Sequence, residues 1–252
     1  MRNTLLLIAI SALWTGASAG NVQIQVLDRE GKPVPDAVVV LYPGNAAGTP
    51  PNLLQASPTI EQEKMRFVPA VTVVSAGTTV RFTNQDRWDH HVRGNPTGVA
   101  PAAAPGAAAA STNFELRLAG KTDGKPANFA DVKLDAPGVV LLGCHLHGSM
   151  RGHVFVTDSA WSLKTDNDGI ARFPSVPDGA AQVRVWHAEQ LVDLPRKALN
   201  VVPGPVLDTV QLSVVPRVRR APPATPSNTP GGPMGAYSQA PAQGAHAHHR
   251  GS

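Results

Sequence analysis

The stretch that most constrains this chain of 252 residues is 143–150, which reads Gly-Cys-His-Leu-His-Gly-Ser-Met. It contains the only cysteine, Cys144, followed three residues later by His147 and three residues after that by Met150. Apolar β-favouring segments lie on both sides of it, so we expect a short loop between two strands. A thiolate, an imidazole and a thioether held on one such loop predict a shared metal ion.

A trigonal site of two histidines and one cysteine with a weak axial methionine is the ligand set of a blue-copper centre. The second histidine is expected at the end of an upstream strand, where His90 and His91 precede Val92. Alternate residues of a strand share a face, so the buried Val92 places His90 inward and His91 away. We therefore predict one type 1 copper site, while zinc could use the same cysteine and histidines. The predicted ligands are His90, Cys144, His147 and Met150.

Residues 60–157 resemble the cupredoxins of the plastocyanin and amicyanin group. The resemblance rests on Phe67-Val68-Pro69, Ala76-Gly77-Thr78, Val80 to Asp86, His90-x-Val92 and Cys144-x-x-His147-x-x-Met150. It implies a Greek-key β-sandwich with copper at one end. One departure is His91, which stands where these proteins usually have an asparagine that braces the copper loop. The resemblance implies that His91 takes over this role or that the site is less rigid.

Residues 20–48 and 159–216 resemble the strands of a carboxypeptidase-regulatory-like (prealbumin-type) β-sandwich. The predicted fold class is thus all-β, with a Greek-key cupredoxin sandwich inserted into a second small β-sandwich. Within the first flank, the apolar alternation of residues 22–26, a turn at 28–33 and the apolar run 37–42 predict a β-hairpin. The same arrangement resembles exported plastocyanin-like chains labelled methylamine utilization proteins, which implies an electron-transfer setting.

Residues 1–19 are predicted to be a Sec-type signal peptide, with Arg2, an apolar stretch from Leu5 and a cleavage site after Ala19. The apolar stretch is short for a membrane span, although an uncleaved anchor is the alternative. We expect a periplasmic or secreted protein without a membrane span after cleavage. In such an oxidising compartment a lone thiol needs a metal or burial to protect it. Residues 94–113 and 217–252 are rich in alanine, proline and glycine, which predicts a mobile loop and a disordered tail.

The formal charge of +4 is mild, and Arg217, Arg219 and Arg220 of the tail contribute much of the excess. No basic stripe alternates with aromatic residues, which argues against nucleic-acid binding. No catalytic triad, carboxylate pair or phosphate-binding loop stands out, so we expect an electron carrier rather than an enzyme. Asp166 and Asp168 fit a turn better than a calcium loop, because no downstream glutamate occupies the EF-hand position.

The leading hypothesis is an exported monomer that carries single electrons between redox protein partners. The second is a copper carrier or storage protein that uses the tail histidines, and the third is a structural β-sandwich binding module. His145 and His153 are expected on the surface, as exit points for an electron or as contacts to a second copper. His187 is expected to be structural. The tail histidines are His246, His248 and His249.

Overall fold

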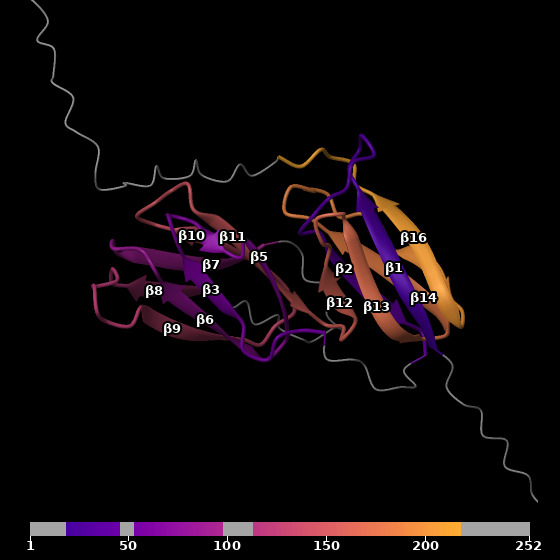
Figure 1. Cartoon of the computed structure of the whole chain (residues 1–252), viewed down its shortest axis with the longest axis horizontal. Coiled ribbons are helices and arrows are strands. Elements are labelled where there is room, and N and C mark those ends of the chain that lie inside the picture. The colour runs from indigo at the N-terminus through magenta and orange to yellow at the C-terminus, as the bar shows by residue number, and fades with distance from the viewer. Residues whose placement is uncertain (1–18, 46–52, 98–112, 218–252) are drawn as a thin grey trace, which may run out of the picture. The chain divides into compact units, whose positions relative to one another are not determined.

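The computed structural model describes residues 19–45, 53–97 and 113–217. The chain divides into two compact units, 1–216 and 217–252, and only Arg217 of the second unit is described. The described residues form strands β1 to β16 and contain no helix (Figure 1). The prediction of an all-β fold is confirmed. Accordingly, none of the described segments is a helix capable of crossing a bilayer.

The inner sandwich consists of two sheets with the strand orders β4-β3-β6-β9 and β5-β11-β10-β7-β8. After β8 the chain crosses to β9 in the opposite sheet, and β10 then returns to pair with β7, which is a Greek-key connection. The strands are β3 (Thr59–Gln62), β4 (Phe67–Val68), β5 (Val71–Ser75), β6 (Thr78–Asn84), β7 (His90–Thr97), β8 (Phe114–Leu118), β9 (Asn128–Leu134), β10 (Gly138–Cys144) and β11 (Arg151–Thr157).

The outer sandwich takes its strands from both sides of this segment, in sheets ordered β13-β1-β16 and β12-β2-β14-β15. The inner sandwich is therefore inserted between β2 and β12 of the outer one, as predicted. The outer strands are β1 (Ala19–Leu27), β2 (Val38–Pro43), β12 (Ser162–Lys164), β13 (Ile170–Pro177), β14 (Gly179–Trp186), β15 (Lys197–Val201) and β16 (Gly204–Gln211).

The predicted hairpin within residues 21–43 is wrong, because β1 and β2 belong to different sheets. β1 pairs with β13 and β16, whereas β2 pairs with β12 and β14. One face of β2 enters the core that it shares with β1, and its Val38 and Val40 enter another buried cluster with Phe155 and Trp186. A continuous apolar run is typical of a strand buried on both faces, but it carries no information about which strands pair with it.

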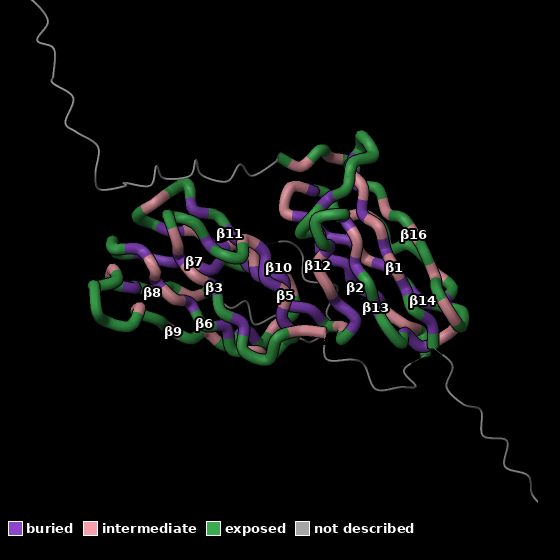
Figure 2. The backbone as a smooth tube through the Cα atoms, in the orientation of Figure 1, coloured by how far each residue is buried: buried purple, intermediate pink, exposed green. Residues whose placement is uncertain are grey.

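The core of the inner sandwich extends to the end of the sheet where β7 begins and β10 ends. The first three residues of β7 are buried, and buried positions alternate with half-buried ones in the second half of β10 (buried residues are purple in Figure 2). Val92 and Leu142 are fully buried in this core, and Cys144 and Met150 belong to the same cluster. His90 and Cys144 thus stand at the ends of strands that pack in this core, which restricts how far they can move.

Three other predicted segments fall largely outside the described residues. These are the signal peptide up to residue 18, the loop at 98–112 and the tail from residue 218. The first residues of the predicted loop differ from expectation, because β7 continues to Thr97, which pairs with Val139 of β10. Backbone pairing to a buried strand outweighs the weak strand preference of Gly94, Asn95 and Pro96.

Candidate metal centre

Three strand ends meet at one end of the inner sandwich and present the predicted ligands. β7 begins at His90, β10 ends at Cys144 and β11 begins directly after Met150. Cys144 pairs with Val92 across the two antiparallel strands, so both side chains lie on the inward face. His90 is two residues from Val92 and shares that face. The choice of His90 by alternation therefore agrees with its position in the sheet.

The donor atoms of His90, Cys144 and His147 form a small triangle. Cys144 Sγ lies 3.6 Å from Nδ1 of His90 and 3.6 Å from Nδ1 of His147, and the two Nδ1 atoms are 3.2 Å apart. The point equidistant from the three atoms lies about 2.0 Å from each, close to the metal–nitrogen distances of histidine sites. The three residues also form the one group of histidine, cysteine or acidic side chains within the described residues that could hold a metal ion.

Burial differs among the four candidate residues. His90 is 1% exposed, Cys144 5% and Met150 1%, whereas His147 is half-buried. The backbone N–H of Met150 donates to the carbonyl of His147 at 3.0 Å, which closes the loop as a turn. Met150 thereby packs in the same apolar cluster as Cys144. Of the four candidate residues, His147 is the most exposed.

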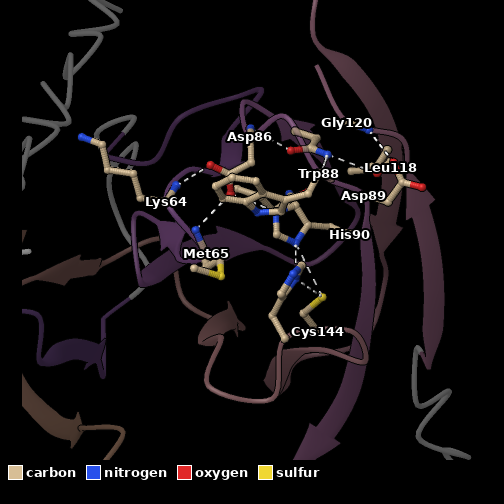
Figure 3. Close-up of polar contacts among 12 residues, drawn as sticks. Lys64, Met65, Asp86, Trp88, Asp89, His90, Leu118, Gly120 and Cys144 are labelled. Carbon is tan, nitrogen blue, oxygen red and sulfur yellow. Dashed lines mark hydrogen bonds and ion pairs between the residues drawn. The ribbon is translucent and has the colours of Figure 1, made fainter. Parts of the chain in front are cut away.

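Asp86 orients His90, a role that the sequence reasoning missed. Its Oδ2 lies 2.9 Å from Nε2 of His90, and its two oxygens accept backbone N–H groups of Lys64 and Met65 at 2.6 and 3.0 Å (Figure 3). An anionic Asp86 makes Nε2 of His90 the protonated nitrogen, which leaves the lone pair of Nδ1 directed at Cys144 and His147. The sequence signal that could have indicated this role is a carboxylate just after a strand and four residues before His90.

The environment of Asp86 keeps it ionised. Burial alone would raise the pKa of its carboxyl, but hydrogen bonds from Met65, His90 and Lys64 outweigh burial and hold that pKa below its usual range. A negative charge is therefore fixed beside the imidazole of His90.

The buried Asn84 holds the segment that carries Asp86. Its Nδ2 donates to the carbonyls of Trp88, Leu118 and Ala119 at 2.9, 3.1 and 3.0 Å, and its Oδ1 accepts the N–H of Asp86 at 2.9 Å. Asn84 is fully buried, and its two amide N–H groups are shared among the three carbonyls while Oδ1 accepts one bond. One side chain thus ties the turn before His90 to the chain that follows β8.

His91 lies on the other side of β7 and is outside the ligand group. Its Nε2 is 3.1 Å from Glu115 and its ring centroid is 5.6 Å from that of His145. Its backbone carbonyl accepts the N–H of His145 at 2.8 Å. The start of β7 is therefore joined to the ligand loop through the backbone of His91, and the ring of His91 packs against His145 of that loop.

The other singled-out histidines have different environments. His145 is exposed, as predicted. His153 was expected on the surface, but it is half-buried with its ring centroid 5.4 Å from that of Trp186, so that prediction is wrong. The ring of His153, on β11, contacts Trp186 of β14 in the outer sandwich. Sequence periodicity does not reveal a contact between two sandwiches. His187 is buried and accepts the N–H of Glu189, a structural role.

No protein-family model matches the sequence, and no curated protein matches it. Among solved structures, a mutant of amicyanin in its Cu(I) form is 22% identical, with 40% of this chain and 83% of that chain covered and a TM-score of 0.28. A pseudoazurin from Sinorhizobium meliloti is 25% identical, with 41% and 76% covered and a TM-score of 0.28.

A copper-containing nitrite reductase from Thermus scotoductus is 21% identical with a TM-score of 0.31, and 46% of this chain matches 25% of that enzyme. The present chain thus spans about a quarter of its length. Similarity to solved structures at TM-scores this low does not establish which residues of this chain bind a metal. The assignment of the site depends on the residues and distances described above.

Proposed function

We propose that the protein is an exported type 1 copper protein that carries single electrons between redox partners. The observation that carries this proposal is the triangle of His90 Nδ1, His147 Nδ1 and Cys144 Sγ, with sides of 3.2 to 3.6 Å. Two imidazole nitrogens and one thiolate, with a buried methionine on the same loop, are the donor set that suits copper in electron transfer. Zinc is the competing ion for the histidines and the cysteine.

Each residue has a defined task. Cys144 binds as a thiolate, and both histidines bind through neutral imidazoles. Asp86 holds His90 in the required tautomer. Copper, when bound, supplies the one-electron change between Cu(I) and Cu(II). Met150 contributes a weak donor, and the packed strand ends that carry His90 and Cys144 limit rearrangement when the charge changes.

The half-buried His147 is the most exposed of the four proposed ligands. We propose that electrons enter or leave through its ring or through the residues of the loop beside it. In this proposal no substrate is converted, and the protein is a monomeric electron carrier. Export after cleavage at Ala19 is part of the proposal and is supported by the composition of residues 1–19. The outer sandwich, which resembles the carboxypeptidase-regulatory-like domains, serves as a scaffold for the copper domain.

Metal stoichiometry and redox cycling test this proposal against copper storage. The full chain and a chain that ends at residue 216 should each bind one copper ion and cycle reversibly in voltammetry. Storage by the tail histidines instead requires several copper ions in the full chain and fewer in the shortened one. Those histidines, His246, His248 and His249, lie outside the described residues. Failure of both chains to bind copper would contradict both functions.

A further inference from the structure

A cationic hollow lies on the outer face of the five-stranded sheet, next to Cys144. Gly143 of β10 pairs with Arg93 of β7 on one side and with Arg151 of β11 on the other. Directly opposite residues project to the same face, so two guanidinium side chains flank a position that has no side chain. The hollow has a volume of about 270 Å³, and its lining includes Cys144 and His145.

The acidic residues around the hollow neutralise only part of this charge. Glu115 of the neighbouring β8 lies 3.1 Å from Nε of Arg93 and also 3.1 Å from Nε2 of His91, so one carboxylate serves two partners. Arg151 uses Nη1 to donate to the carbonyl of Met150 at 3.0 Å. Among the described residues, no carboxylate lies within 4.0 Å of Arg151. A positive excess therefore remains beside the copper loop.

The shape of the hollow suits a carboxylate. A Cβ atom added to Gly143 would meet only Nη1 of Arg151, at 3.5 Å, so an incoming group can approach the strand between the two arginines. Guanidinium groups bind carboxylates through two parallel charge-assisted hydrogen bonds. Leu146, on the loop between the lining residues His145 and Gly148, is 55% exposed and offers an apolar contact to a docked partner. An apolar contact next to a charged rim is the usual composition of a protein–protein interface.

We propose that this hollow receives a carboxylate of an acidic redox partner protein and so docks the partner beside Cys144. This inference rests on the proposed electron-transfer function and names the partner's chemistry. Gly143 is bonded directly to the thiolate-bearing residue, so docking here brings the partner's surface to the copper site. Complementary charge raises the association rate at low salt, and the effect fades as ionic strength rises.

The binding test uses the copper-free full chain, so that it does not depend on the metal. Hexacyanocobaltate(III), a redox-inert trianion, is titrated at low salt while the backbone amides are followed by NMR. We expect saturable shifts centred on Gly143, His145 and Gly148. Arg93→Gln should weaken binding roughly fivefold through the loss of one charge-assisted contact. Gly143→Asp keeps both arginines and fills the hollow with a carboxylate, so it should abolish the shifts.

Arg81→Gln is the matched control, because it removes one positive charge on β6 of the opposite sheet, where Arg81 pairs with Asp131. It should leave the titration unchanged within about twofold, since a distant exposed charge is largely screened. Shifts centred elsewhere, or equal losses in Arg93→Gln and Arg81→Gln, would overturn the proposed site.

The functional test uses the Cu(I)-loaded full chain and compares two oxidants. Oxidation by the anion hexacyanoferrate(III) should slow roughly threefold to tenfold in Arg93→Gln at low salt and recover toward the wild-type rate at high salt. Oxidation by the cation tris(phenanthroline)cobalt(III) should not slow. Anion binding in the hollow with unchanged oxidation rates would show a small-anion site and overturn the docking role. If copper does not bind, the electron-transfer function fails while the NMR titration still reports on the hollow.

Discussion

Oδ2 of Asp86 lies 2.9 Å from Nε2 of His90, and both side chains are buried. The carboxylate also accepts two backbone N–H groups, from Lys64 and Met65, so its position is fixed by three bonds rather than one. A carboxylate held in this way presets the tautomer of His90 and adds a negative charge to the surroundings of the metal. The consequences can be measured.

Asp86→Asn should raise the reduction potential of the copper site and weaken Cu(II) binding about 10- to 100-fold, because it removes the charge that favours the higher oxidation state. Voltammetry and competitive copper titration measure the two effects. Asp131→Asn removes an equivalent charge from an exposed pair with Arg81 and should change neither quantity appreciably. Identical potentials in wild type and Asp86→Asn would show that Asp86 is only structural.

Asn84→Ala should lower the free energy of unfolding of the copper-free protein by at least about 2 kcal/mol, because it leaves buried carbonyls without donors. Denaturant unfolding provides the measurement. Asn128→Ala is the control, since the amide of Asn128 also donates to the carbonyl of Ala119 but is exposed. The account of Asn84 would be wrong if both variants were equally stable.

Met150→Leu and Met150→Ala separate packing from coordination. Met150 is 1% exposed, so the alanine variant should lose about 2–5 kcal/mol of unfolding free energy through the cavity it creates. The leucine variant conserves volume and should lose less than about 1.5 kcal/mol. With copper bound, however, the leucine variant should still change the reduction potential and the spin-resonance spectrum. A leucine variant with the spectrum and potential of wild type would exclude Met150 as a ligand.

The stability contributed by the turn at Asp166 should depend on pH. Hydrogen bonds from the backbone of Ile170 and from Arg172 lower the pKa of the Asp166 carboxyl. Because the pKa of Asp166 is lower in the folded than in the unfolded protein, its ionised carboxylate stabilises the fold at pH values above the unfolded pKa of about 3.9. This stabilisation is lost as the pH falls through the pKa of the folded state. Asp166→Asn should therefore be less stable than wild type near neutral pH and converge with it in acid. A constant difference down to the lowest accessible pH would contradict this assignment.

The turn geometry itself agrees with the sequence-based choice of a turn over a calcium loop. Oδ1 of Asp166 accepts the N–H groups of Asp168 and Ile170, so this oxygen serves the backbone. Such local bonds are typical of aspartate in turns.

The sequence predicted the loop of candidate ligands because Cys144, His147 and Met150 lie within seven consecutive residues. It also placed His90 next to this loop, because strand alternation with Val92 translates directly into a shared face. Asp86 was missed because its role depends on the path of the chain through Lys64 and Met65, which no periodicity reveals. The false hairpin of β1 and β2 has a similar origin, since apolar runs define strands but not their partners.

The central claim is tested most directly by the absorption spectrum of the full chain after one equivalent of Cu(II) is added. An intense blue thiolate-to-copper charge-transfer band should appear in wild type and be absent from Cys144→Ser. Cys144→Ser should keep the wild-type fold by NMR, because serine is nearly isosteric with cysteine. A wild-type protein that binds Cu(II) at the site and stays colourless would contradict the assignment of a type 1 copper centre.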